Sequence, residues 1–160
     1  MKSAFLVVSA TALLVPAISC GGSPAAPITA PSQSVSFAGT WNGTSIDSQG
    51  ATIVTWALTQ TGSTAAGTVK TEAVDPNDGS CNSCHRNKTG TFSGTTSGTT
   101  LTLTMFFAAG GAGDPTPACT ATLTGTASRV AADTLTAAYS GADSCEGPFM
   151  DGTLMMTRHP

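Results

Sequence analysis

Charge is what this sequence has least of. Among 160 residues, six are Lys or Arg and nine are Asp or Glu, which gives a formal net charge of −3. The basic residues form no cluster, and nucleic-acid binding needs a basic surface that neutralises phosphates, so a nucleic-acid partner is excluded. Histidine is equally scarce, with only His85 and His159. Neither lies in a motif of a hydrolase triad, a zinc protease or a phosphate-binding loop, and we expect a protein that is not an enzyme.

A single long apolar run is present, at the N-terminus. One basic residue, Lys2, precedes an uncharged stretch over residues 4–16. A run of this length is shorter than the roughly 20 residues that span a bilayer, and it is typical of a secretory signal. The residues that follow, Ala17-Ile18-Ser19-Cys20, resemble the lipobox of bacterial lipoproteins. That resemblance implies cleavage before Cys20 and attachment of lipid to its thiol.

The lipobox resemblance also implies where the protein resides. A lipidated Cys20 would anchor the chain to a membrane, and Gly21 instead of Asp after it favours the outer membrane, with the protein facing the periplasm or the surface. Residues 20–35 are rich in Pro, Gly and Ser, which predicts a flexible tether. We therefore expect a signal peptide over 1–19, a tether over 20–35 and one domain over 36–160. Without Lys2, that mature chain has five basic and nine acidic residues, a net charge of −4.

The predicted domain is rich in threonine and glycine, with 28 and 18 copies in the whole chain. Threonine favours strands, and the residues alternate with the period of two that a half-buried strand requires. In residues 99–107, for example, Leu101, Leu103 and Met105 alternate with threonines. The pattern predicts eight strands, at residues 37–46, 51–60, 64–72, 89–96, 99–108, 118–129, 134–141 and 151–159.

The links between these strands are short, which predicts an all-β antiparallel up-and-down meander. About eight such strands can close into a barrel, and a β-sandwich is the second choice. Gly-Thr pairs occur eight times, and we expect several of their glycines at turns or strand ends.

The pattern also resembles known barrels. Gly39-Thr40-Trp41 followed by an up-and-down series is similar to the lipocalin and avidin folds. The whole of 36–160 resembles a group of uncharacterised bacterial lipocalin-like lipoproteins, through residues 56–60 (Trp-Ala-Leu-Thr-Gln), the hairpin bearing Cys119 and Cys145, and Gly152-Thr153-Leu154. This resemblance implies a β-barrel. The polar residues with which avidins hold biotin have no match here, so biotin is not expected.

Two interpretations of the interior remain open. Trp41, Trp56, Phe92 and Phe107 either fill the core or line a ligand cavity. Small residues expected to face inward leave room for a cavity: Ala57, Ala121 and Ala137. We expect a cell-envelope binding or structural module, whose partner is a small apolar molecule in the barrel or an envelope protein at its open end.

Four cysteines remain in the predicted mature domain. Because an exported protein meets an oxidising compartment, an even number predicts disulfides. A hairpin that turns near residues 131–132 brings Cys119 within disulfide reach of Cys145. Cys81 and Cys84 are then left for each other.

The second pair belongs to a sharper motif. Cys81-Asn82-Ser83-Cys84-His85 has the Cys-x-x-Cys-His spacing of covalent haem attachment. The alternative function is therefore an electron-transfer lipoprotein with c-type haem, whose second axial ligand comes from a methionine or from His159. A disulfide that staples a polar loop is favoured over haem and over a redox-active dithiol, and we expect no cofactor and no metal, neither zinc nor calcium. The candidate methionines are Met105, Met150, Met155 and Met156.

Acidic residues gather near the last predicted hairpin. Asp143, Glu146 and Asp151 offer carboxylates of the kind that paired acid–base catalysis uses. In a polar loop, however, such residues are more often solvated surface, and that is our expectation here.

Overall fold

A computed structural model describes residues 35–74, 88–110, 119–145 and 147–159. These residues form eight strands and no helix, so none of them belongs to a helix that is long and apolar enough to cross a membrane. The predicted signal peptide, Cys20 and the tether up to residue 34 lie outside the described residues, and the domain boundaries stay predictions. The strands are β1 (Gly39–Asp47), β2 (Gly50–Thr61), β3 (Thr64–Ala73), β4 (Thr89–Ser97), β5 (Thr100–Phe107), β6 (Ala121–Ala131), β7 (Thr134–Asp143) and β8 (Gly147–His159).

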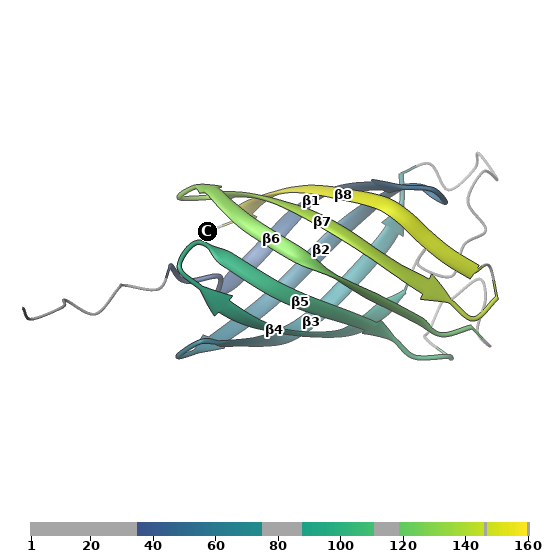
Figure 1. The fold of residues 1–160 in the computed structure, drawn as a ribbon, viewed down its shortest axis with the longest axis horizontal. Coiled ribbons are helices and arrows are strands. Elements are labelled where there is room, and N and C mark those ends of the chain that lie inside the picture. Colours follow the sequence, from purple (N-terminus) through teal and green to yellow (C-terminus); the bar gives the residue numbers. More distant parts are fainter. Residues whose placement is uncertain (1–34, 75–87, 111–118, 146, 160) are drawn as a thin grey trace, which may run out of the picture. The chain divides into compact units, whose positions relative to one another are not determined.

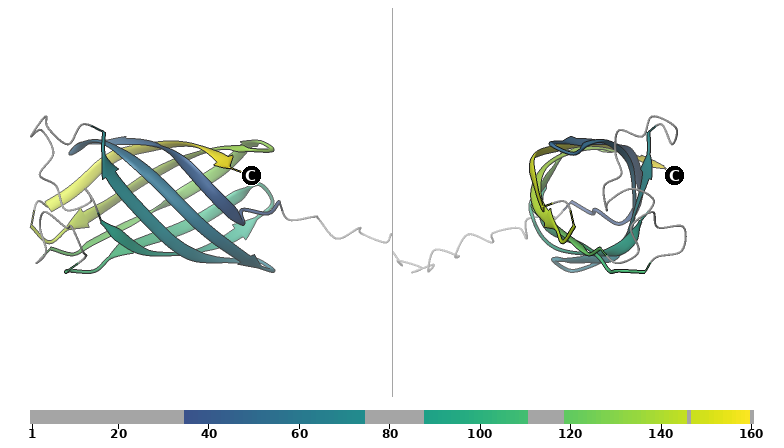
Figure 2. Two further views of the ribbon diagram at one scale, coloured as in Figure 1. Left: turned by 180° about the vertical axis from the view of Figure 1, so that it is seen from behind. Right: turned by 90° about the vertical axis from the view of Figure 1, so that its right-hand side faces the viewer.

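The strands close into one barrel. Each pairs antiparallel with the next in sequence, and β8 pairs with β1, from Thr40 opposite His159 to Ile46 opposite Thr153. The end-on view in Figure 2 shows the complete ring, and Figure 1 shows the strands crossing the barrel obliquely. The predicted closed up-and-down barrel is confirmed, and the β-sandwich alternative is wrong.

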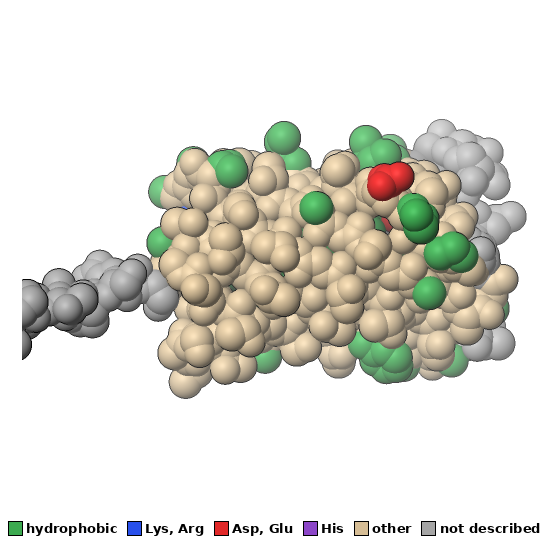
Figure 3. All heavy atoms as spheres, viewed as in Figure 1, with side chains coloured by type: hydrophobic (Ala, Val, Ile, Leu, Met, Phe, Trp, Pro, Cys, Tyr) green, Lys and Arg blue, Asp and Glu red, His purple; other side chains and the backbone are tan. Residues whose placement is uncertain are grey.

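Alternation along each strand sorts side chains between the interior and the outer wall. On β5, Leu101, Leu103, Met105 and Phe107 are at most 4% exposed, whereas threonines of the same strand face out. Threonine suits this wall because a β-branched side chain packs well on the pleated outer surface while its hydroxyl meets water. The face in Figure 3 is accordingly almost free of charged side chains.

Two glycines of the Gly-Thr pairs lie where expected: Gly98 in a turn and Gly39 at the start of β1. Most of the others lie inside strands and face inward, as Gly43 and Gly67 do. A Cβ on Gly43 would collide with the backbone oxygen of Met155, and one on Gly67 with that of Ala57. These glycines let neighbouring backbones approach closely where the tilted strands bend around the barrel.

The two ends of the barrel differ. We call one the entry pole: it holds residues 35–38, the two-residue turns after β2, β4 and β6, and the end of β8 (left in Figure 1). Gly62 and Gly98 begin two of these turns with φ of 57°, a left-handed conformation that glycine adopts without strain. The other end, the far pole, holds the β1–β2 turn, the ends of β3, β5 and β7, and the starts of β4, β6 and β8.

Residues before β1 plug the entry pole. Phe37 is fully buried, its N–H donates to Gln60 Oε1 at 2.7 Å, and its carbonyl accepts from Trp41 Nε1 at 2.8 Å. The predicted first strand began at residue 37, but Phe37 precedes β1 because its backbone bonds to these side chains instead of to a neighbouring strand.

Large side chains fill the rest of the interior. Trp41, Trp56, Phe92 and Phe107 are at most 2% exposed, and the rings of Trp56 and Phe92 lie 4.8 Å apart between centroids. They form the core. Among the small residues expected to face inward, Ala121 and Ala137 do so. Ala57 does not, because it alternates with the buried Trp56 and Leu58 and therefore lies on the outer wall.

Candidate functional site

Polar side chains enter the barrel interior at the far pole. Ser45, Thr52 and Thr71 are at most 4% exposed and come from the far ends of β1, β2 and β3. Tyr139 of β7 is 6% exposed and reaches the same region. Because the middle of the barrel is largely apolar, this polar group distinguishes the far pole of the interior.

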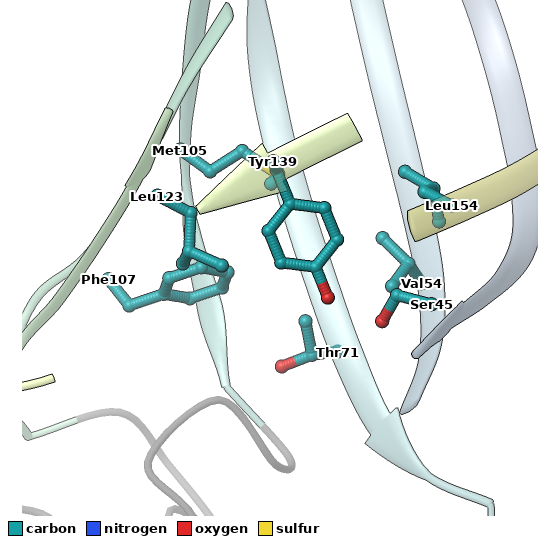
Figure 4. A pocket seen from close by; sticks show the side chains of 8 residues that line it. All are labelled: Ser45, Val54, Thr71, Met105, Phe107, Leu123, Tyr139 and Leu154. Carbon is teal, nitrogen blue, oxygen red and sulfur yellow. The ribbon is translucent and has the colours of Figure 1, made fainter. Parts of the chain in front are cut away.

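A small cavity lies beside this group. Its volume is about 10 Å³, which is at the lower limit of the space that one water molecule needs. The Tyr139 hydroxyl points toward Ser45 and Thr71 at its polar edge, as Figure 4 shows. The remaining lining is apolar: Val54, Met105, Phe107, Leu123 and Leu154. This cavity is therefore too small to hold an apolar ligand.

Tyr139 forms a hydrogen bond across the far pole. Tyr139 Oη donates to Asp47 Oδ2 at 2.6 Å, which joins β7 to β1. Burial, and then the hydrogen bond to Asp47, raise the pKa of Tyr139 well above its ordinary value of 10.0. The phenol therefore stays protonated and acts as a donor, not as a base.

Two buried polar groups of β2 have no hydrogen-bond partner among the described residues. They are Thr52 Oγ1 and Trp56 Nε1, and both side chains are fully buried. They lie on either side of Val54 in the inward-facing row, and Val54 lines the small cavity. Unsatisfied buried groups are rare in folded proteins, and bound water is their usual partner.

Two buried charged residues surround the disulfide at the far pole. Lys88 is 1% exposed, and its Nζ donates to the carbonyl of Cys119 at 2.9 Å. Asp143 is 4% exposed, and its Oδ1 accepts from the N–H of Cys145 at 2.7 Å. The expectation of a solvated Asp143 is wrong: the end of β7 turns its side chain inward. Asp151 is exposed, as expected, and Glu146 lies outside the described residues.

The predicted bond between Cys119 and Cys145 is confirmed, with Cα atoms 5.7 Å apart. Both sulfur atoms lie within 4.8 Å of an Asp143 oxygen, a spacing that could suit a metal ion. A disulfide sulfur is not the thiolate that zinc binds, so in its oxidised form this trio is not a metal centre.

The Cys-x-x-Cys-His motif lies outside the described residues, so Cys81, Cys84 and His85 have no described position. The proposed second axial ligands do. Met105 and Met156 are buried in the filled core, whereas Met150 and Met155 are exposed. His159 ends β8 at the entry pole, opposite the pole where the β3–β4 connection carrying the motif begins and ends.

The outer wall carries one apolar patch that sequence reasoning missed. Ile53 of β2 and Met155 of β8 lie on either side of Thr44 in β1, and Ile46 follows two residues further along β1. The exposed fractions of the patch are 39% for Ile53, 58% for Ile46 and 63% for Met155. Ile46 and Met155 of the patch also line an open groove of about 660 Å³ over β1, β6, β7 and β8. The signal for this patch in the sequence was an apolar residue at outward-facing strand positions that elsewhere hold threonine.

No family model matches this sequence, and no curated protein matches it. Among solved structures it is similar to a redesigned beta barrel, with 15% identity, a TM-score of 0.50, and coverage of 77% of this chain and 91% of that chain. A second redesigned beta barrel, bound to DFHBI, has 17% identity and a TM-score of 0.48, over 76% of this chain and 94% of that chain. At 15% sequence identity, the likeness to the first of these structures concerns the fold alone: this chain folds as a closed antiparallel β-barrel.

Proposed function

We propose that the protein is a lipid-anchored lipoprotein of the bacterial cell envelope, related to the lipocalin-like lipoproteins, and that its barrel is a non-enzymatic binding or structural module. The observation that carries this proposal is the filled interior. Pockets for small molecules usually measure about 300–1,000 Å³. The internal cavity here measures about 10 Å³, so the barrel serves as a rigid body and not as a container.

A rigid body of this kind interacts through its outside. The exposed patch of Ile46, Ile53 and Met155 is the feature that favours a protein partner, because contiguous exposed apolar side chains mark interaction surfaces. This replaces the small apolar ligand as the favoured partner.

Two features support a location in the cell envelope. The disulfide between Cys119 and Cys145 is of a kind that persists in oxidising compartments. The apolar stretch followed by Cys20 supports export and lipid attachment. Localisation to the outer membrane rests on Gly21 alone.

The arrangement of the described residues supports a role without catalysis. Their single histidine, His159, is exposed at the end of β8, away from the polar group at the far pole. Tyr139 of that group donates its hydroxyl hydrogen to Asp47 in a hydrogen bond.

The test is fatty-acid labelling of the full chain in a bacterial host, compared with Cys20→Ser and with Cys81→Ser as the matched cysteine control. We expect label on the wild type and on Cys81→Ser, and none on Cys20→Ser. A wild type without label would refute the anchor. A visible absorption spectrum of the same wild-type preparation, made with a haem-attachment system, should show no covalent haem. A haem band would instead establish the electron-transfer alternative.

A further inference from the structure

Two arginines meet at the entry pole around a neutral acceptor. Arg129 Nη1 and Arg158 Nη2 each donate to the carbonyl of Ser36 at 2.6 Å. Both guanidinium groups also lie over the Trp41 ring, at 5.5 Å for Arg129 and 4.7 Å for Arg158. Because the shared acceptor is a carbonyl and not a carboxylate, it does not neutralise either charge.

The arrangement leaves binding capacity for an anion. Burial, and then the charge of Arg158, lower the pKa of Arg129, so the two cations are close enough to repel each other. Among the residues that the structure describes, the acid whose charge acts on Arg129 is Asp133. Phosphate oxygens suit guanidinium donors especially well.

The other charged residues that the structure describes, apart from Asp133, lie toward the far pole. The other basic residues that the structure describes lie toward the far pole, where Lys70 pairs with Glu72 at 2.9 Å and Lys88 is buried. Asp47, Asp143 and Asp151 lie there too. Strands of 8 to 13 residues keep the poles roughly 20–30 Å apart, which exceeds the screening length of about 10 Å at 0.1 M salt. The acids therefore do not cancel the entry pole's positive charge.

The position of the tether favours a membrane phosphate as the anion. Fourteen residues lie between Cys20 and Val35, and the fifteen steps from one Cα atom to the next reach at most about 50 Å. The tether joins the barrel at the entry pole, where the N–H of Val35 bonds to the carbonyl of Gly98. A lipid on Cys20 would bring this pole within reach of the membrane surface.

We propose that the entry pole rests on an anionic phospholipid surface, with Arg129 and Arg158 contacting lipid phosphates while the far pole points away. This inference rests on the lipid anchor of the proposed function for its geometry. Its test does not, because the contact itself needs no attached lipid.

The experiment uses residues 20–160 with Cys20→Ser, which retains every described residue. Co-sedimentation is measured with phosphatidylglycerol–phosphatidylcholine vesicles and with pure phosphatidylcholine vesicles. We expect binding to the anionic vesicles only, weakened by salt and about five-fold by each of Arg129→Gln and Arg158→Gln. Lys70→Gln, which removes a far-pole cation, should bind as the parent does. Equal binding to both vesicles, or arginine variants that bind like the parent, would overturn the proposal.

A second readout covers arginine variants that fail to fold. The chain has two tryptophans, so Trp56→Phe leaves Trp41, beneath both arginines, as the sole tryptophan. Its emission should change with anionic vesicles and not with neutral ones. A response to inorganic phosphate without any response to vesicles would assign the arginines to a free anion and refute the membrane contact. Failure of fatty-acid labelling would refute the anchor independently.

Discussion

Tyr139 is the only tyrosine in the chain, so its ionisation can be followed directly. Its raised pKa means that the folded state keeps the phenolic proton above pH 10, where the unfolded state loses it. Stability from this group is therefore complete below pH 10 and falls as pH rises beyond it, by at most about 1.4 kcal/mol per pH unit. Tyrosinate absorbance in a pH titration should show the folded phenol ionising well above the urea-unfolded one.

The matched variant for that titration is Asp47→Asn. It keeps an acceptor for the Tyr139 hydroxyl but removes the negative charge that helps to raise the pKa. Tyrosinate should form at lower pH than in the wild type. If folded wild type and unfolded chain titrate together, Tyr139 is neither buried nor hydrogen-bonded to Asp47 in solution.

For single residues, the sequence predicts whether a side chain faces inward or outward better than it predicts which residues that side chain contacts. In β7 the inward-facing Tyr139 alternates in step with Leu135, but its partner Asp47 lies 92 residues away in the sequence. The burial of Lys88 and Asp143 could not be predicted, because it depends on which strand ends meet at the far pole. Polarity alone assigned Asp143 to the surface.

Among the strand pairs, the β6–β7 hairpin is the one that a described disulfide stabilises, between Cys119 and Cys145. The disulfide closes a loop with a sequence separation of 26, and the hydrogen bond from Ser144 N–H to the carbonyl of Thr120 continues the ladder beside it. Cys119→Ala with Cys145→Ser should lower the free energy of unfolding by about 3 kcal/mol in the chain-entropy model, measured by urea denaturation.

Cys81→Ser with Cys84→Ser is the control for that loss, because a disulfide between those residues would close a much shorter loop. Its effect should be clearly smaller. A larger effect from the Cys81–Cys84 pair would mean that the motif loop, and not the hairpin, depends on its cysteines.

Strand positions were predictable to within a few residues, because threonine and apolar residues alternate so regularly. The last strand is the exception in length: it begins at Gly147, four residues before the predicted start. Asp151 interrupts its alternation there with a φ of 54°, beside the register shift between Tyr139 and Gly141. The inward glycines were missed for another reason: close backbone approach follows from curvature, which a single strand's pattern does not contain.

At the scale of the whole molecule, short links predicted the closed barrel, but the filling of its interior depends on the summed volume of side chains from all eight strands. Phe107→Ala would extend the small cavity, at a cost of about 3–5 kcal/mol. We expect benzene to raise the melting temperature of this variant and not of the wild type, measured by calorimetry.

Phe106→Ala is the matched control, because the neighbouring Phe106 lies on the outer wall and is 43% exposed. It should neither lose comparable stability nor bind benzene. Stabilisation of the wild type by benzene would show that the interior admits ligands, and the rigid-body proposal would then fail.

The seam between β1 and β8 has a consequence for the order of folding. It joins residues near the two ends of the domain, such as Thr40 and His159, so no ring exists until the last strand has arrived. Contacts this distant in sequence make folding slow, because the chain loses most of its conformational entropy before the stabilising contacts of the closed ring form. A chain that crosses a membrane N-terminus first would therefore remain incomplete, with β1 lacking a neighbour on one side, until its final residues emerge.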